Sequence, residues 1–423
     1  MGKRKHLVIG CGSAALSAVE TIRRSGADDE IKITSAENYP PYSPTALPYL
    51  LSGRIGESEL WMRPSDYFQK LGVNFQKGKE AVEVIPERKE VRYRDGTSDK
   101  YDTLLIATGA SPVKPAIEGL NEVGFVGFRT LDDYRSLVEQ LNGKKRAVIL
   151  GAGLVAMEVA MGLAEKGCRV DVVARSRVLR AYFDVEAEAL IKEIFRGEGV
   201  NFVAGQRPAA IRRNERGIEV VLSNGDYLAA DVVVGATGVK PNVGFLEGSG
   251  IKVGTGVLVD KSMRTNVSDV FAAGDVAEGP DFFTGKPGMN AILPSAVEQG
   301  KAAGAAMAGK EASYEGWIPM NVFSFFGHVA FSVGLSTIAD PRYRVLKEAD
   351  DNRRQFRKLV LDGDRLVGAM FVNADLDPGL FLYLIRKRVS IEAHAEALFE
   401  HPREISRGLM LRNERREIGL AWG

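Results

Sequence analysis

Two glycine-rich segments of this chain have the residue types that hold a pyrophosphate. Residues 7–15 read LVIGCGSAA, and residues 147–156 read AVILGAGLVA. Each is an apolar run followed by glycines and then by small residues. That order predicts a strand that turns tightly into a helix whose first N–H groups face the phosphates of a dinucleotide. Two copies indicate two dinucleotides, and the chemistry they imply together is electron transfer between them.

A second motif is also repeated. Residues 101–109 read YDTLLIATG and residues 231–238 read DVVVGATG, so an apolar strand ends in small residues both times. Residues 6–37 have the pattern of strand, glycine turn, helix and strand. The simplest account is two halves of similar layout.

The chain is therefore expected to have an α/β fold with two Rossmann-like dinucleotide-binding domains, one inserted in the other, and a C-terminal α+β domain. Apolar spacing near the end predicts a helical tail. The expected domains are 1–113 with 242–318 for the first dinucleotide, 114–241 for the second, and 319–423 as an interface domain.

The composition excludes several classes of protein. The 423 residues include 56 Lys and Arg against 55 Asp and Glu, a net charge of +1, so no nucleic-acid partner is expected. No apolar run reaches the roughly 20 residues of a membrane span. The four histidines show no paired spacing, so we expect no metal site. With two cysteines, Cys11 and Cys168, a reducing, cytoplasmic location is expected.

The N-terminus allows two interpretations. Residues 3–11 resemble a short signal sequence that ends in a lipid-acceptor cysteine, Cys11. We prefer the interpretation as a first strand, because cleavage before Cys11 would delete that strand.

Taken together, the motifs resemble the FAD-dependent pyridine nucleotide–disulfide oxidoreductase superfamily. The match covers roughly residues 1–320, and within the family the chain is most similar to ferredoxin and rubredoxin NAD(P) reductases and to flavin subunits of larger oxidoreductases. The motifs that carry the resemblance are Gly10-Cys11-Gly12, Ala107-Thr108-Gly109, Gly151-Ala152-Gly153, Ala236-Thr237-Gly238 and Gly274-Asp275, in that order.

The resemblance implies an FAD site in the first domain. Glu37 would bind the adenosine ribose, although it also fits an exposed surface acid. Ser295 and Glu298 would form a capping box after Pro294, and the family aims this helix at the flavin. The residues implied for FAD are Gly10, Gly12, Ala15, Glu37, Thr108, Gly109, Gly274, Asp275 and Ser295.

The resemblance also implies a nicotinamide dinucleotide site. Glu158 matches a family glutamate near the nicotinamide, although it also fits a solvent-facing helix residue. Ala174 stands where an NAD enzyme has an acid, and the arginines that follow suit the 2′-phosphate of NADP. Because related flavin subunits mostly use NAD, we expect NAD narrowly and do not exclude NADP. The implied residues are Gly151, Gly153, Ala156, Glu158, Arg175, Arg180 and Gly238, with Arg177 between the other arginines.

The sequence departs from the disulfide-reducing members. Residues 42–48 read YSPTALP, with Thr45 where single-cysteine members have their thiol, and Tyr49 stands where ferredoxin reductases have a lysine. Cys11 and Cys168 fit small packing residues. Thiol relay, peroxide reduction and disulfide reduction are therefore not expected.

The expected function is an NAD(P)H oxidoreductase that exchanges hydride with nicotinamide and single electrons with an iron–sulfur protein or subunit, with no side chain acting as acid or base. We expect an oligomer or a subunit of a hetero-complex. The alternatives are a flavin-bearing assembly or sensing subunit and a free-standing NADH oxidase. The aromatic run at 322–326 fits ordinary sheet core, a flavin contact or an oligomer face.

Overall fold

The computed structural model describes residues 3–26, 28–143, 145–215 and 217–417. The chain divides into two compact units. Unit 1 consists of Met1–Leu50, Arg54–Val113 and Val239–Ile318, and unit 2 consists of Leu51–Gly53, Lys114–Gly238 and Pro319–Gly423.

Unit 1 is built on a parallel sheet of five strands in the order β18-β7-β1-β2-β3. Every neighbouring pair in it is parallel. The central strands are almost fully buried, as expected for a parallel sheet covered on both faces. The strands are β1 (Lys5–Ile9), β2 (Glu30–Thr34), β3 (Val73–Gln76), β7 (Thr103–Ile106) and β18 (Val270–Ala272).

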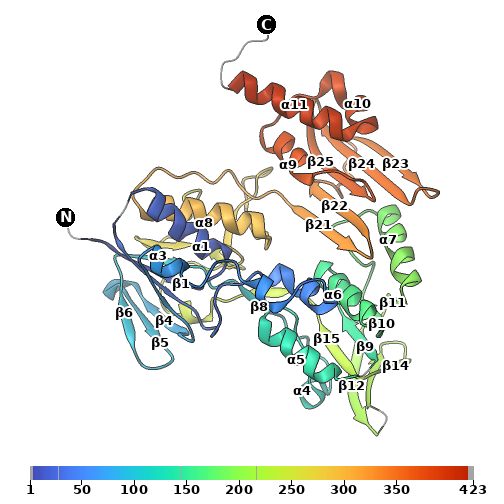
Figure 1. Ribbon diagram of the computed structural model, residues 1–423, viewed down its shortest axis with the longest axis horizontal. Helices are drawn as coiled ribbons and strands as arrows, with labels where there is room; N and C mark the ends of the chain where they lie inside the picture. Colours follow the sequence, from blue (N-terminus) through green and yellow to red (C-terminus); the bar gives the residue numbers. More distant parts are fainter. Residues whose placement is uncertain (1–2, 27, 144, 216, 418–423) are drawn as a thin grey trace. The chain divides into compact units, whose positions relative to one another are not determined.

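Two helices of unit 1, α1 (Ser13–Arg24) and α8 (Leu293–Met307), pack closely together (Figure 1). A Cβ atom on Gly304 would lie 2.3 Å from the carbonyl oxygen of Ala18. The two backbones therefore approach more closely than any larger side chain at this position would allow.

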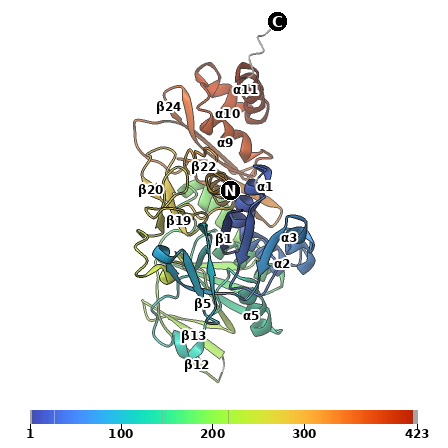
Figure 2. The ribbon, with the colours of Figure 1, turned by 90° about the vertical axis from the view of Figure 1, so that its left-hand side faces the viewer.

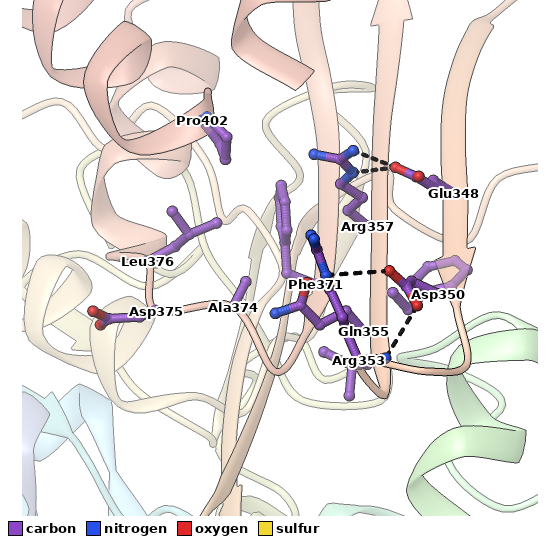
Figure 3. A pocket seen from close by; sticks show the side chains of 12 residues that line it. Glu348, Asp350, Arg353, Gln355, Arg357, Phe371, Ala374, Asp375, Leu376 and Pro402 are labelled. Carbon is purple, nitrogen blue, oxygen red and sulfur yellow. Dashed lines mark hydrogen bonds and ion pairs between the residues drawn. The ribbon is translucent and has the colours of Figure 1, made fainter. Parts of the chain in front are cut away.

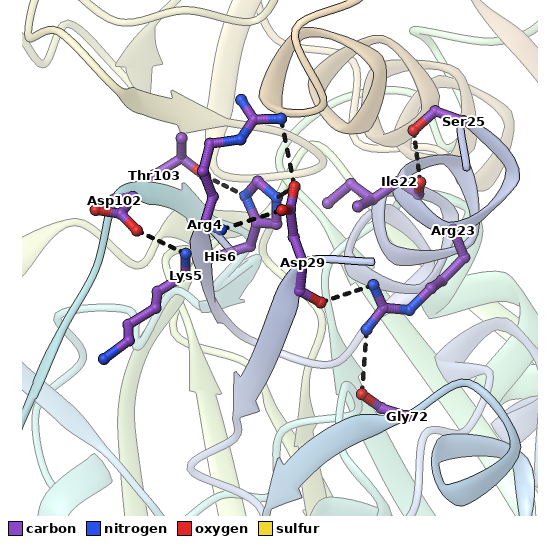
Figure 4. A network of polar contacts seen from close by, with 10 residues as sticks. All are labelled: Arg4, Lys5, His6, Ile22, Arg23, Ser25, Asp29, Gly72, Asp102 and Thr103. Carbon is purple, nitrogen blue, oxygen red and sulfur yellow. Dashed lines mark hydrogen bonds and ion pairs between the residues drawn. The ribbon is translucent and has the colours of Figure 1, made fainter. Parts of the chain in front are cut away.

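A polar network lies at the amino ends of β1 and β7, whereas the glycine turn follows the carboxyl end of β1 (Figure 4). His6 is buried in β1; its Nδ1 is 2.6 Å from the hydroxyl of Thr103 and its Nε2 is 3.0 Å from the carboxylate of Asp29. Burial lowers the pKa of His6. Arg23 in α1 donates to the carbonyl oxygens of Asp29, at 2.8 Å, and Gly72, at 3.1 Å. The network joins β1, β7, α1 and the segment that leads into β2.

The remaining elements of unit 1 are small. Helix α2 (Leu47–Ser52) lies on the division between the units, and α3 (Tyr67–Lys70) is a single turn. The short strands are β4 (Ala81–Ile85), β5 (Glu90–Tyr93), β6 (Ser98–Lys100), β8 (Ala110–Pro112), β16 (Val239–Pro241), β17 (Val257–Leu258), β19 (Ala277–Pro280) and β20 (Pro287–Gly288).

Unit 2 contains a second parallel sheet, in the order β11-β10-β9-β15, and a three-stranded antiparallel sheet. The parallel strands are β9 (Arg146–Leu150), β10 (Arg169–Ala174), β11 (Val200–Ala204) and β15 (Val232–Gly235). The antiparallel strands are β12 (Pro208–Asn214), β13 (Gly217–Leu222) and β14 (Tyr227–Ala230). The helices are α4 (Leu120–Val123), α5 (Leu131–Leu141), α6 (Leu154–Glu165) and α7 (Val185–Gly197).

The C-terminal part of unit 2 is an antiparallel sheet in the order β21-β22-β25-β24-β23, followed by helices. Figure 2 shows these helices gathered together in red. The strands are β21 (Met320–Phe325), β22 (His328–Gly334), β23 (Arg344–Asp350), β24 (Gln355–Asp362) and β25 (Arg365–Val372), and the helices are α9 (Pro378–Arg386), α10 (Ala395–Glu400) and α11 (Pro402–Glu417). The predicted fold class, with two Rossmann-like cores and a C-terminal α+β part, is confirmed. Residues 418–423 of the predicted tail lie outside the described residues.

The aromatic run of β21 packs inside unit 2. Phe323 and Phe325 are fully buried and stack on Phe195 of α7, with ring centroids 5.9 Å and 5.4 Å apart. At the other end of α7, Asp184 forms an ion pair with the buried Lys358 of β24, at 2.9 Å. Of the three interpretations of this run, ordinary core is therefore the one that its two buried rings support.

The three-domain division stays a prediction. The compact units do not separate residues 114–238 from residues 319–423. Among the described helices, none has both the length and the apolar character needed to cross a membrane.

Candidate functional site

The turn after β1 leaves space for a pyrophosphate at Gly12. At Gly10 it has no space for a side chain. This glycine has φ +101°, and a Cβ atom on it would lie 2.1 Å from the carbonyl oxygen of Ala107. Gly12 is the N-cap of α1; no side chain caps the helix, and among the described residues no atom lies within 4 Å of where its Cβ would be. Ala15 is fully buried. The free N–H groups and the open space fit the phosphates of FAD.

The turn after β9 repeats this geometry in unit 2. Gly151 has φ +136°, and a Cβ atom on it would lie 2.1 Å from the carbonyl oxygen of Ala236. Gly153 is the N-cap of α6, again with no side-chain cap, and Ala156 is fully buried. The hydroxyl of Tyr182 comes within 4.0 Å of a Cβ built on Gly153. This turn fits a second pyrophosphate, as a nicotinamide dinucleotide requires.

Glu37 lies near the first glycine turn. Its carboxylate accepts a hydrogen bond from the hydroxyl of Tyr42 at 2.6 Å. Burial raises the pKa of the Cys11 thiol to about 12, and the negative charge of Glu37 adds to this effect. Glu37 is therefore placed beside the turn where an adenosine ribose is predicted, and Cys11 is a protonated thiol at neutral pH.

The second cysteine is no better suited to thiol chemistry. Cys168 is buried, and burial raises its pKa. Neither Cys11 nor Cys168 is in a disulfide. Both fit the packing role that the sequence indicates.

The carboxyl end of β18 brings Gly274 and Asp275 to the start of α1. Gly274 has φ +85°, and a Cβ atom on it would lie 3.1 Å from the Cβ of Ala14. Its N–H donates to the side-chain oxygen of Gln299 in α8 at 2.8 Å. Sequence reasoning missed Gln299, because a glutamine inside a helix carries no motif. Asp275 follows directly and is half-buried.

The predicted helix cap at Ser295 is wrong. α8 begins at Leu293, with Ile292 as its N-cap and Pro294 in its first turn, where the missing N–H of proline costs nothing. Ser295 therefore lies inside the helix; it is buried, and its hydroxyl accepts a hydrogen bond from the side-chain amide of Asn290 at 3.1 Å. No capping box with Glu298 forms, and α8 has no side-chain cap.

Thr108 and Gly109 form hydrogen bonds with Asn242, which belongs to a segment of unit 1 far away in sequence. The Thr108 hydroxyl donates to the carbonyl oxygen of Asn242 at 2.9 Å, and the Asn242 side chain returns a bond to the Thr108 carbonyl at 2.9 Å. The N–H of Asn242 also donates to the carbonyl of Gly109 at 3.0 Å. The adjoining strands β8 and β16 pair antiparallel. Gly238, with φ +113°, directly precedes β16. Thr108 and Gly109 therefore help to join the two segments, and the predicted cofactor roles of Thr108, Gly109 and Gly238 stay predictions.

Glu158 lies in the first half of α6, the helix that begins at the second glycine turn. It is half-buried, and burial raises its pKa to about 7. Burial also raises the pKa of Tyr182, and the charge of Glu158 contributes to this shift. The half-buried position of Glu158 differs from that of an ordinary solvent-facing glutamate, and its role near the nicotinamide stays a prediction.

A hollow lies in the C-terminal part of unit 2. It has a volume of about 250 Å³, and its lining comes from residues 348–402. Figure 3 shows its rim, where Arg357 pairs with Glu348 and the N–H of Arg353 donates to Asp350 at 3.0 Å. None of the predicted site residues lines this hollow. The described residues contain no cluster of His, Cys, Asp and Glu that could hold a metal ion.

Comparison with known proteins identifies the class. Residues 4–300 match the family described as pyridine nucleotide-disulphide oxidoreductase, and the chain belongs to this family. It is 37% identical over 410 residues to the NADH-dependent phenylglyoxylate dehydrogenase subunit epsilon of Aromatoleum evansii, covering 96% of this chain and 97% of that one. It is 31% identical over 320 residues to an NADH oxidase of Methanocaldococcus jannaschii, covering 73% and 71%.

The structure has a matching neighbour. A NAD-dependent persulfide reductase from A. fulgidus superposes with a TM-score of 0.84 at 30% identity, over 93% of this chain and 78% of that one. With both glycine turns in place, the chain is an FAD-dependent NAD(P)H oxidoreductase of the branch without a redox disulfide. The resemblance, the enzyme class and the use of FAD with NAD(P)H are thereby confirmed.

Proposed function

We propose that this protein exchanges hydride with a nicotinamide dinucleotide and single electrons with an iron–sulfur protein or subunit. The observation that carries the proposal is the pair of glycine turns in a chain whose two cysteines are both protonated packing residues. With no thiol to take the electrons, their next acceptor has to be another molecule. Similarity along almost the full length to a dehydrogenase subunit supports a place in a larger complex.

The residues of this chain bind and orient. When bound, FAD takes up a hydride from reduced nicotinamide and passes electrons on singly. Gly10 and Gly12 let the N–H groups of α1 face one pyrophosphate, and Gly151 and Gly153 do the same at α6. Glu37 and Asp275 offer carboxylates to the ribose and the ribityl chain. No side chain has to transfer a proton in the hydride step.

A two-stage experiment tests this proposal. The purified protein is reduced with NAD(P)H without oxygen, and a ferredoxin-type iron–sulfur protein is then added. We expect yellow protein, bleaching by NAD(P)H, and return of the colour as the iron–sulfur protein is reduced. Colourless protein, or bleached protein that the iron–sulfur protein does not reoxidise, would contradict the proposal.

A second candidate is a free-standing NADH oxidase, which the similarity to the Methanocaldococcus jannaschii protein favours. Oxygen uptake distinguishes the two. If the isolated chain consumes oxygen faster than it reduces the iron–sulfur protein, the oxidase is the better description. Weak turnover alone, with co-purifying iron-containing chains, would instead favour the assembly or sensing subunit.

A further inference from the structure

Three arginines follow β10, and the structure gives them different surroundings. The Arg177 guanidinium donates to the carboxylate of Glu188 and, at 3.2 Å, to the carbonyl oxygen of Phe183. Glu188 is only 3% exposed, and its other oxygen accepts the N–H of Val178 at 3.1 Å. The charge of Arg177 is therefore neutralised by a buried carboxylate, and this carboxylate also fixes the backbone of the loop.

Arg175 and Arg180 are not engaged in this way. Both are exposed, and neither forms a hydrogen bond or ion pair with any residue that the structure describes. Arg175 directly follows the last residue of β10. Arg180 follows Leu179, whose N–H donates to the carbonyl of Ala152 inside the second glycine turn at 2.7 Å. One arginine is thus fixed at the end of the second strand and the other beside the phosphate turn.

The same loop lacks the group that would recognise the ribose of NAD. A carboxylate at the end of the second strand normally accepts from the ribose 2′-hydroxyl. Here that place is taken by the buried Ala174, and residues 174–183 contain no acid. The next acid, Asp184, is paired with Lys358 at 2.9 Å, and Glu188 is paired with Arg177. A 2′-hydroxyl therefore meets no free carboxylate of this loop, while a 2′-phosphate meets two uncommitted guanidinium groups.

Resting on the proposed function, we infer that Arg175 and Arg180 recognise the 2′-phosphate of NADP(H) and make NADPH the preferred nicotinamide. Arg177 is a positioning residue that supports the loop through Glu188. This reverses the narrow preference for NAD that the sequence alone favoured, which rested on the cofactor use of related flavin subunits and on the lack of an arginine at Ala174 itself. A guanidinium–phosphate contact of this kind is worth about tenfold in affinity.

The test compares the dissociation constants of NADP⁺ and NAD⁺ by calorimetry in the FAD-loaded protein. We expect NADP⁺ to bind at least about tenfold more tightly, with an affinity that falls as salt is added. Arg175→Ala and Arg180→Ala should each weaken NADP⁺ about tenfold and leave NAD⁺ nearly unchanged, and Arg175→Lys should restore part of the loss. Arg169→Ala is the matched control, because Arg169 is an exposed arginine at the other end of the same strand.

Arg177→Ala separates support from recognition. It should lower the melting temperature and weaken NADP⁺ and NAD⁺ by the same factor. NAD⁺ binding as tightly as NADP⁺ in the parent protein, or arginine variants that weaken both dinucleotides equally, would overturn the inference. Bleaching of the flavin by NADH at the rate seen with NADPH would reject this inference and leave the proposed function standing, whereas bleaching by neither would reject the proposed function.

Discussion

A Cβ atom on Gly300 of α8 would lie 2.2 Å from the carbonyl oxygen of Ala14 in α1. Ala14 belongs to the first turn of the helix that carries Gly12 at its N-cap. The preceding residue of α8, Gln299, accepts a hydrogen bond from the N–H of Gly274. The close contact of these two helices therefore sets the position of two parts of the predicted FAD site at once.

We expect Gly300→Ala to destabilise the protein and to reduce its FAD content. The added methyl group meets backbone atoms, so the helices must separate, and overpacking of this kind costs about 1–3 kcal/mol. Urea unfolding and the flavin absorbance per protein measure both effects. Gly408→Ala is the control, because Gly408 lies in α11 with no described atom within 4 Å of its Cβ position. That variant should gain about 0.5–1 kcal/mol, and equal behaviour of the two variants would count against a specific role for the α1–α8 contact.

We expect the same steric change in the two glycine turns to remove different cofactors. Gly10→Ala and Gly151→Ala each place a methyl group 2.1 Å from a carbonyl oxygen. Gly10→Ala should yield protein that lacks FAD. Gly151→Ala should yield yellow protein whose flavin is not bleached by NAD(P)H but is bleached by dithionite. A Gly151→Ala protein that NAD(P)H reduces at the parent rate would refute the assignment of this turn to the nicotinamide dinucleotide.

We expect Glu158→Gln to stabilise the protein increasingly as pH rises. The pKa of Glu158 is raised to about 7 by burial, so the folded state holds a proton that the unfolded state releases near its ordinary pKa of 4.5. Stability of the parent protein therefore falls as pH rises between these two values. The Gln variant has no proton to release at this position. Its free energy of unfolding should therefore exceed that of the parent protein by an amount that grows to on the order of 2 kcal/mol above about pH 7. Urea unfolding across this range measures the difference, and parallel curves for the two proteins would contradict it.

We expect the two thiols to be unreactive in the folded protein. Burial raises the pKa values of Cys11 and Cys168, so neither forms an appreciable thiolate at neutral pH. A thiol reagent such as dithionitrobenzoate should react with both only after unfolding, which absorbance at neutral pH measures.

Replacement of both cysteines by alanine is the matching functional control. Reduction of an artificial one-electron acceptor should persist in that protein. Rapid labelling of the folded parent, or loss of turnover in the replaced protein together with normal FAD content, would restore thiol chemistry to the mechanism.

The sequence by itself determined the fold class and the two glycine turns. The requirement for glycine at Gly10 and Gly151 is local, because a positive φ and a close carbonyl group admit no side chain there. The alternation of apolar strands and small-residue helix starts is likewise a local pattern, because each motif consists of consecutive residues. For these reasons the dinucleotide sites could be predicted without the structure.

Tertiary structure alone decided which side chains are engaged and by what. Ser295 looked like a helix cap because its spacing to Glu298 is right, but proline is tolerated in the first turn and α8 begins two residues earlier. The burial of Phe325 on Phe195 joins residues far apart in the chain. Likewise, Arg177 and Arg175 are equivalent in sequence, and only the buried carboxylate of Glu188 separates them. Local propensity fixes backbone shape within a few residues, whereas partners brought together by folding fix which charges are neutralised and which stay available to a ligand.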